Sequence, residues 1–388
     1  MGTLSSSERR LDGDHAACVS WAGTDHLVVS YRNGFIVVLK ASKRGTSVRT
    51  RGFVQVSKLN SGCCAGRSAA PHERPTVLAA GGLQNTVEVW SLGAESTVFM
   101  AGVPAAVLRG HEGYVSAVSF VQPTGGSGGH HLLSASGDGT CRLWDVDKAQ
   151  TVLGLLGHQG DISGLKVPTD CGGRLAVTSS LDTTVRVWDL RTGACVRLFE
   201  APGTLTENGV HRAEVEGVDM TGDGTLVAAA MRFGWATYDV RGYGVIGSAK
   251  TRTPKTSIAF VGNGKACIGG SELGTLRVID TFRPERRHTP EFECSPGVTG
   301  KSVGGAERAD RVATLASCPD GSPCFASASL RSGIVRTWGW THDPRTMQAA
   351  SVENHEPKNL VACSCCFCCG TIECFKGGRG ARVCCCDL

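Results

Sequence analysis

Two sets of histidine, serine, aspartate and tryptophan residues stand at similar spacing in neighbouring parts of the chain. The first set is His111, Ser136, Asp138 and Trp144, and the second is His158, Ser180, Asp182 and Trp188. Serine, histidine and aspartate are the residues of a nucleophilic triad, so each set raises the hypothesis of acyl transfer. The duplication favours a structural role, because a buried polar set is tolerated only when every member has a partner. We therefore interpret both sets as structural tetrads and expect no catalytic residue and no enzyme activity.

The segment SPGVTGKS, from Ser295 to Ser302, is close to a phosphate-binding loop but departs from it. That motif requires glycine at the position of Ser295, a strand before it and a helix after it. Here Pro and Glu precede the segment and Gly-Gly-Ala follows it, so no helix N-terminus is expected to receive a phosphate. The sequence predicts no nucleotide site and no cofactor.

Cysteine is concentrated at the C-terminal end, where nine of the 19 cysteines fall in the last 26 residues. Adjacent cysteines fit zinc geometry poorly, and clean C-x-x-C arms are missing, so we expect no metal. The last four residues, CCDL, have the length of a prenylation signal, but Asp387 suits it poorly, and palmitoylation of a tail cysteine is a further alternative. The simplest interpretation of residues 343–388 is a disordered Cys-rich tail. An enzyme or metal protein that works through this tail is the competing hypothesis.

The composition excludes several classes of protein. A formal net charge of +5 over 388 residues is too dilute to indicate nucleic-acid binding. No apolar run is long enough for a signal peptide or a membrane span. We expect a cytoplasmic protein with ten reduced cysteines outside the tail, which reaches the inner face of the plasma membrane only through partners or tail lipidation. The 52 glycines indicate many tight turns.

The elements that position the two tetrads repeat with a fixed period. Trp144-Asp145 and Trp188-Asp189 lie 44 residues apart, and each closes a Ser/Thr-rich strand, a tight turn and an alternating strand. This period, with four short strands in each copy, is the signature of a WD40 propeller blade. The position of the tryptophan recurs seven times, always after an alternating β-rich run. The residues there are Leu39, Trp90, Trp144, Trp188, Tyr238, Ile279 and Trp338.

Seven copies predict an all-β fold, a seven-bladed WD40 β-propeller over residues 6–342. The N-terminal segment Glu8 to Leu11 is expected to supply the missing outer strand of blade seven and so to close the ring. SVRTRGFVQV is expected to be the fourth strand of blade one, and a short outer strand is expected near EFEC. Cys63 to Pro75 and Gly125 to His131 are expected to be loop-like insertions.

The chain resembles one WD40 family in particular, the β subunit of heterotrimeric G proteins. The segments that carry the resemblance are SWAGTDHLVVS, AAGGLQN, LRGHEGYVS, SASGDGTCRLWD, GHQGDIS and SSLDTTVRVWDLRTGAC, in the family's order. The resemblance implies a protein-binding platform that holds a Gα subunit in its GDP state and engages effectors after release. A WD40 scaffold of another complex, without a γ subunit, is the alternative.

The resemblance also implies which residues bind the partner. Leu83, Tyr114 and Asp161 match family positions on the narrow face, and Glu214 stands where the family has aspartate. Leu330 stands where the family has a contact tryptophan, and the family's N-terminal helix for Gγ has no counterpart before Ser6. Three alternatives follow: γ is absent, the sequence is shortened, or the partner differs.

Overall fold

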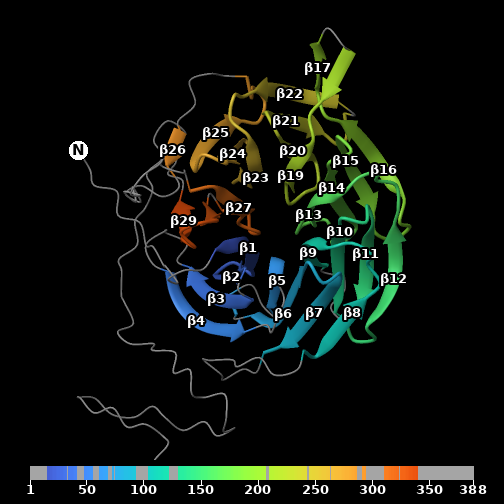
Figure 1. Ribbon diagram of the computed structural model, residues 1–388, viewed down its shortest axis with the longest axis vertical. Coiled ribbons are helices and arrows are strands. Elements are labelled where there is room, and N and C mark those ends of the chain that lie inside the picture. Colours follow the sequence, from blue (N-terminus) through green and yellow to red (C-terminus); the bar gives the residue numbers. More distant parts are fainter. Residues whose placement is uncertain are drawn as a thin grey trace, which may run out of the picture. The chain divides into compact units, whose positions relative to one another are not determined.

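The computed structural model describes residues 15–32, 34–41, 48–55, 61–68, 72–73, 75–92, 104–121, 130–206, 209–242, 244–262, 264–285, 291–293, 310–322 and 324–339. These residues form β-strands joined by turns, and no helix is present among them. Within these ranges there is accordingly no helix that could cross a membrane. Seven antiparallel sheets stand around a central axis, so the seven-bladed propeller is confirmed (Figure 1).

In each blade, hydrogen bonds join consecutive strands, and the first strand is the innermost. Blade 1 contains β1 (Ala16–Ala22), β2 (His26–Tyr31), β3 (Phe35–Ala41) and β4 (Val48–Gln55). Blade 2 contains β5 (Ser61–Ser68), β6 (Pro75–Gly82), β7 (Thr86–Ser91) and β8 (Ala106–Arg109). Blade 3 contains β9 (Val115–Val121), β10 (His131–Ser136), β11 (Cys141–Asp145) and β12 (Gln150–Leu155). Blade 4 contains β13 (Ile162–Lys166), β14 (Leu175–Ser180), β15 (Thr184–Asp189) and β16 (Cys195–Glu200).

The other three blades follow the same plan. Blade 5 contains β19 (Val215–Met220), β20 (Leu226–Met231), β21 (Gly234–Asp239) and β22 (Gly244–Lys250). Blade 6 contains β23 (Lys255–Val261), β24 (Ala266–Ser271), β25 (Thr275–Asp280) and β26 (Glu291–Glu293). Blade 7 contains β27 (Val312–Ser317), β28 (Cys324–Ser329) and β29 (Val335–Gly339). The expected fourth strand of blade 1 and the short strand near EFEC are therefore confirmed as β4 and β26.

The hydrophobic core is divided into seven clusters, and each cluster lies between two neighbouring blades. Blades 1 and 2 share one cluster, blades 2 and 3 the next, and the series ends with blades 7 and 1. The residue at the tryptophan position of each blade is buried in the cluster shared with the preceding blade. This holds for Leu39, Trp90, Trp144, Trp188, Tyr238, Ile279 and Trp338. Burial of apolar surface between blades therefore holds the ring together.

The expected insertion from Cys63 to Pro75 is wrong for most of its length. Residues 63–68 belong to β5, the innermost strand of blade 2, and Pro75 begins β6. A Cβ atom on Gly66 would lie 2.6 Å from Val28 and 2.7 Å from Ala22 of blade 1. Only small residues fit this contact, so the strand lacks the bulky alternating pattern by which strands are predicted. His131, the end of the second expected insertion, likewise begins β10.

The ring closes through direct contacts between blades 7 and 1. The indole N–H of Trp21 donates to the carbonyl of Ala316 at 3.1 Å, and one hydrophobic cluster spans both blades. Glu8 to Leu11 and the tail from residue 343 lie outside the described residues, so closure by the N-terminal segment and tail disorder stay predictions, as do the domain limits.

A two-stranded hairpin between blades 4 and 5 was not expected from the sequence. It consists of β17 (Gly203–Thr206) and β18 (Gly209–Arg212), and it extends beyond the ring in Figure 1. The Asn-Gly pair at positions 208–209 stands at the start of β18, and Asn-Gly between two strands is a known hairpin signal. That dipeptide could have predicted the hairpin.

Candidate partner-binding face

The first tetrad links the entry of blade 3 to its strands β10 and β11. The His111 ring contacts Asp138 Oδ2 through Nδ1 at 2.9 Å and Ser134 Oγ through Nε2 at 2.8 Å. The Trp144 indole N–H donates to the same Ser134 oxygen at 2.8 Å. The network therefore contains His111, Ser134, Asp138 and Trp144.

The prediction that Ser136 provides the tetrad hydroxyl is wrong. In the β10–β11 register Trp144 lies opposite Leu132, which makes Ser134 its diagonal neighbour on the same face. Ser136 is two residues closer to the turn, where its hydroxyl donates to the carbonyl of Gly113 and accepts from the N–H of Asp138. Ser136 therefore stabilises the turn, and His111 contacts Ser134 instead.

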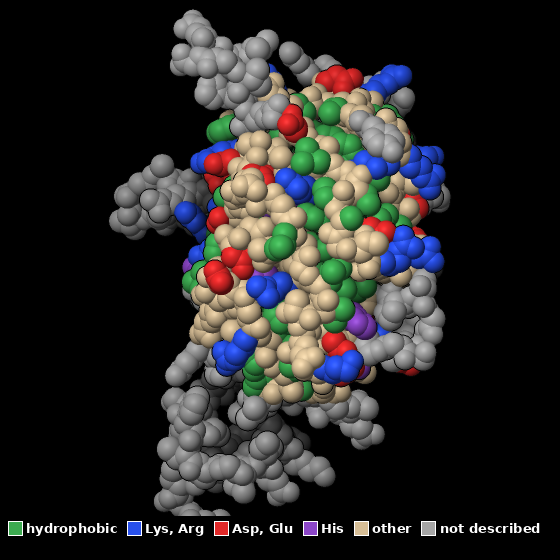
Figure 2. Space-filling model, turned by 90° about the vertical axis from the view of Figure 1, so that its right-hand side faces the viewer, with side chains coloured by type: hydrophobic (Ala, Val, Ile, Leu, Met, Phe, Trp, Pro, Cys, Tyr) green, Lys and Arg blue, Asp and Glu red, His purple; other side chains and the backbone are tan. Residues whose placement is uncertain are grey.

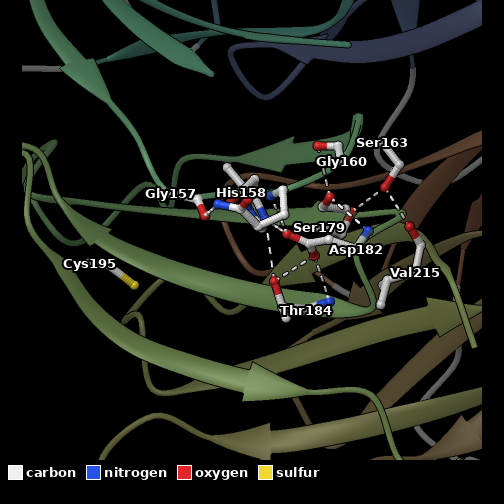
Figure 3. Close-up of polar contacts among 12 residues, drawn as sticks. Gly157, His158, Gly160, Ser163, Ser179, Asp182, Thr184, Cys195 and Val215 are labelled. Carbon is white, nitrogen blue, oxygen red and sulfur yellow. Dashed lines mark hydrogen bonds and ion pairs between the residues drawn. The ribbon is translucent and has the colours of Figure 1, made fainter. Parts of the chain in front are cut away.

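The second tetrad repeats this geometry in blade 4, and Thr178 takes the place that the sequence had assigned to Ser180. His158 contacts Asp182 Oδ2 at 2.8 Å and Thr178 Oγ1 at 2.8 Å, and the Trp188 indole donates to Thr178 at 2.9 Å. Ser180 donates to the carbonyl of Gly160 instead. Figure 3 shows His158, Asp182 and Thr184 converging at the end of the blade.

The electrostatics of both tetrads favour neutral histidine and ionised aspartate. Burial lowers the pKa of His158, against the raising effect of Asp182, and the same balance lowers the pKa of His111. Burial opposes ionisation of Asp182, but hydrogen bonds from Thr184, from the Gln159 N–H and from His158 outweigh it and lower its pKa to about 2.

The tetrads are unsuited to nucleophilic catalysis. The Ser134 and Thr178 side chains are fully buried, and each hydroxyl lies between a histidine and a tryptophan. No substrate carbonyl can approach an oxygen in that position, because attack requires open space beside the nucleophile. Their chemistry is mutual hydrogen bonding, and it fixes the turn that carries Asp138 or Asp182.

These turns lie at one end of the propeller, together with the partner-binding residues that the sequence predicted. In an antiparallel meander the start of the first strand and the turn between the second and third strands share one end. Tyr114, Asp161 and Glu214 directly precede first strands, and Leu83 follows the second strand of blade 2. We call this end, defined by these four residues, the entry face.

The structure brings Tyr114 and Asp161 into contact. The Tyr114 hydroxyl donates to Asp161 Oδ2 at 3.0 Å, across 47 residues of sequence. Burial and the neighbouring carboxylates of Asp161 and Glu216 raise the pKa of Tyr114 to about 12, so the phenol stays protonated. Leu83 is 63% exposed, and it lines the mouth of the same central channel as Tyr114.

Glu214 is held apart from that pair. Its carboxylate forms an ion pair with Arg232 at 2.9 Å, between the first-strand entry and the turn of blade 5. Leu330, at the position where the resembled family has tryptophan, is partly buried, and its carbonyl contacts the ring of His15 at 2.9 Å. Of the four predicted residues, Tyr114 and Asp161 are therefore in direct contact, and Leu83 and Glu214 flank them at the same end.

Sequence reasoning missed further exposed apolar residues on the entry face. Phe233 and Leu273 are half exposed, and each occupies the turn position at which blades 3 and 4 carry Asp138 and Asp182. The turn sequences RFG and ELG, beside GDG and LDT, contained this signal. Blades 5 and 6 thus present apolar side chains where blades 3 and 4 use a buried hydrogen-bonded carboxylate.

Exposed apolar side chains also occur on the outer wall. Val152 in β12 and Val196 and Leu198 in β16 are exposed. On this wall, hydrophobic side chains are interspersed with lysine and arginine (Figure 2). Scattered single apolar residues of this kind are normal on a protein surface. The entry face remains the stronger candidate.

The central channel has a volume of about 1100 Å³ and is crossed at the end opposite the entry face. Lys166 forms an ion pair with Asp219 at 3.2 Å and donates to Ser317 Oγ at 2.7 Å. The Thr169 hydroxyl donates to the carbonyl of Pro319 at 3.0 Å. Blades 4 and 7 therefore touch across the axis. Among the described residues no group of three histidine, cysteine or carboxylate side chains could hold a metal ion.

Comparisons with known proteins agree with this architecture. The family described as WD domain, G-beta repeat matches residues 102–145 and 149–189, which contain both tetrads. Several curated relatives carry the name guanine nucleotide-binding protein subunit beta, among them the following three. That of Saccharomyces cerevisiae is 30% identical over 34% of this chain and 30% of its own length. That of Oryza sativa subsp. indica is 28% identical over 54% of this chain and 55% of its own length. That of Arabidopsis thaliana is 31% identical over 54% of this chain and 55% of its own length.

The matched part thus spans about half the length of the plant relatives and less than a third of the yeast relative. The repeat match, the seven blades and the buried tetrads all point to one architecture. The chain is a seven-bladed β-propeller that contains WD40 repeats at residues 102–145 and 149–189 and resembles the β subunit of guanine nucleotide-binding proteins.

Proposed function

We propose that this chain is a G-protein-β-like subunit that binds a Gα subunit, and effectors in turn, through its entry face. The observation that carries the proposal is the contact between Tyr114 and Asp161 at the mouth of the channel, beside the exposed Leu83. An aromatic ring with a polar handle and a nearby leucine are the side chains on which binding energy concentrates. The chain acts as a non-catalytic interaction platform, with Gγ as a further candidate partner.

The hydrogen bond between Tyr114 and Asp161 prepares this surface for a partner. It holds the phenol ring in one orientation before binding, so less side-chain entropy is lost when a partner packs against it. Asp161 keeps a second carboxylate oxygen for a donor on the partner. Glu214 and Arg232 extend the polar rim toward blade 5.

The proposal is tested by pull-down of a GDP-loaded Gα from the same organism. The double variant Tyr114→Ala with Asp161→Ala is expected to bind at least about 10-fold more weakly, because loss of a hot-spot contact costs more than about 1.4 kcal/mol. Phe282→Ala is the matched control, since Phe282 is 55% exposed in a turn at the opposite end of the ring. Equal binding by wild type and the double variant would sink the proposal.

The cellular place proposed for the chain follows from its partners. We propose a cytoplasmic protein that reaches the inner face of the plasma membrane through Gα, Gγ or lipidation of the tail. Cell fractionation checks this: the chain should move from the membrane to the soluble fraction when Gα is depleted and tail lipidation is blocked. If Gα binding fails while other proteins are captured on the entry face, the alternative scaffold without γ is supported.

A further inference from the structure

Two cysteines from neighbouring blades meet at the wall of the central channel. Cys18 lies in β1 of blade 1, is partly exposed and lines the channel. Cys64 lies in β5 of blade 2, is only 2% exposed, and belongs to the hydrophobic cluster against which Cys18 packs. The Cys64 sulfur is 3.9 Å from the Cys18 carbonyl oxygen, and both residues line the channel wall.

We propose that Cys18 and Cys64 are a redox-active dithiol that reacts with a hydroperoxide in the channel and forms a disulfide between blades 1 and 2. β1 and β5 approach closely enough for such a bond, because blade 2 packs on blade 1 through glycine and alanine at Gly66 and Ala22. Because the Cys64 sulfur already lies 3.9 Å from the Cys18 backbone, the two sulfurs can be joined without a large backbone movement.

The orientation of β5 separates this pair from the third cysteine nearby. Successive side chains of a strand point to opposite faces. Cys64 faces blade 1, where its thiol donates to the Val28 carbonyl at 3.5 Å, whereas Cys63 faces blade 3 and donates to the Val115 carbonyl at 3.6 Å. The arrangement is therefore a pair of thiols, and Cys63 is an equally buried neighbour that cannot join it.

The two thiols have the complementary properties that a dithiol requires. The neighbouring Cys64 side chain lowers the pKa of Cys18, against the raising effect of burial, and so favours a thiolate on the side that lines the channel. Burial raises the pKa of Cys64, so this thiol stays protonated. Nucleophilic cysteines are generally accessible and of lowered pKa, and their partners are buried.

The chemistry balances with one hydroperoxide as the oxidant. The Cys18 thiolate attacks one oxygen of hydrogen peroxide and breaks the O–O bond; the hydroxide released takes up a proton, leaving water and a sulfenic acid on Cys18. The Cys64 sulfur then attacks the Cys18 sulfur and breaks the S–O bond, while the thiol proton of Cys64 leaves with the hydroxide as a second water. Two thiols lose two electrons, and one peroxide is reduced to two waters.

The experiment treats the reduced full-length chain with hydrogen peroxide, blocks free thiols with iodoacetamide, and identifies linked peptides by mass spectrometry without reduction. A peptide joined through Cys18 and Cys64 is expected in wild type and in Cys63→Ser, and it should be lost in Cys64→Ser. In Cys64→Ser, Cys18 is expected to accumulate as the sulfenic acid, which dimedone traps.

A second measurement uses wild type alone and does not depend on the folding of variants. Iodoacetamide should label Cys18 at least about 10-fold faster than Cys63, Cys141 and Cys267, because burial raises the pKa of these three thiols. The proposal is overturned if Cys63 is labelled as fast as Cys18, or if peroxide links other cysteine pairs while Cys18 and Cys64 stay reduced. Neither outcome bears on Gα binding.

Discussion

Ser134 and Thr178 provide the tetrad hydroxyls, whereas serines only two residues away in the sequence have another role. Each hydroxyl accepts from a buried indole and contacts a buried histidine, while Ser136 and Ser180, two residues away, stabilise the turn. Serine in blade 3 and threonine in blade 4 perform the same role because only the hydroxyl is required. Each tetrad thereby satisfies four side chains, of which the histidine, the hydroxyl residue and the tryptophan are buried.

The tetrad histidines should make the fold sensitive to mild acid. Burial lowers the pKa of His111 and His158 below the ordinary 6.5, so the unfolded chain binds their protons first as pH falls. Stability is therefore full above about pH 6.5 and decreases below it, by at most about 1.4 kcal/mol per pH unit for each histidine. Urea unfolding between pH 7.5 and 5 measures this slope.

The control for this prediction is a surface histidine. His130 also contacts an aspartate, Asp147, at 3.1 Å, but its side chain is 42% exposed. His158→Gln should reduce the pH slope, and His130→Gln should leave it unchanged. A slope that is the same in all three proteins would mean that the tetrads do not cause the acid sensitivity.

At the scale of the elements, the contact between blades decides which residues a strand accepts. Every tryptophan-position residue packs against the preceding blade, so each second and third strand is sandwiched between two sheets. The innermost strand β5 contains Gly and Ala for the same reason, since the first strands converge on the axis. Side-chain volume at these positions is limited by the neighbouring blade.

Gly269 tests this limit between blades 5 and 6. A Cβ atom at this position in β24 would overlap the buried indole of Trp235 in β21. Gly269→Ala is therefore expected to destabilise the protein by about 1–3 kcal/mol or more through overpacking. Gly154→Ala in the outer strand β12 is the matched control, because nothing lies within 4 Å of its Cβ. Denaturant unfolding that shows equal stability for both variants would contradict the packing argument.

At the scale of the whole molecule, the two ends of the channel differ. The entry face carries the Tyr114–Asp161 pair and exposed apolar residues, whereas the opposite end is crossed by Lys166, which contacts Asp219 of blade 5 and Ser317 of blade 7. A partner at the entry face therefore meets a ring that is braced on the other side. Its bond to Ser317 joins blades 4 and 7, which share no sheet and no hydrophobic cluster.

Lys166→Met should weaken this brace and lower the stability of the whole ring. Asp219 is almost fully buried, so the loss of Lys166 leaves a buried carboxylate without its counter-charge, at a cost of about 1–3 kcal/mol. The double variant Lys166→Met with Asp219→Asn should recover part of that loss in thermal or urea unfolding. Strictly additive effects of the two substitutions would show that the ion pair does not matter.

The fold was predictable from the sequence because its signals are local. The seven tryptophan-position residues and the turns of two or three residues appear within each copy, and all seven lie in third strands as expected. β5 was missed because its small residues reflect a neighbouring blade, and the hairpin β17–β18 because it interrupts the period. The candidate site was predictable as four positions at one end, without the contacts among them.

The sequence by itself determined the architecture, the number of blades and the end at which the proposed partner-binding residues lie, because strand alternation and turn chemistry act over a few residues. Only the tertiary structure decided that Thr178 and not Ser180 meets His158, that Tyr114 bonds to Asp161, and that Cys18 lies against Cys64. These contacts depend on the register between strands and on the packing of different blades. The contact between Tyr114 and Asp161 joins residues 47 positions apart, and the contact between Lys166 and Ser317 joins residues 151 positions apart. Both contacts are set by the closure of the ring.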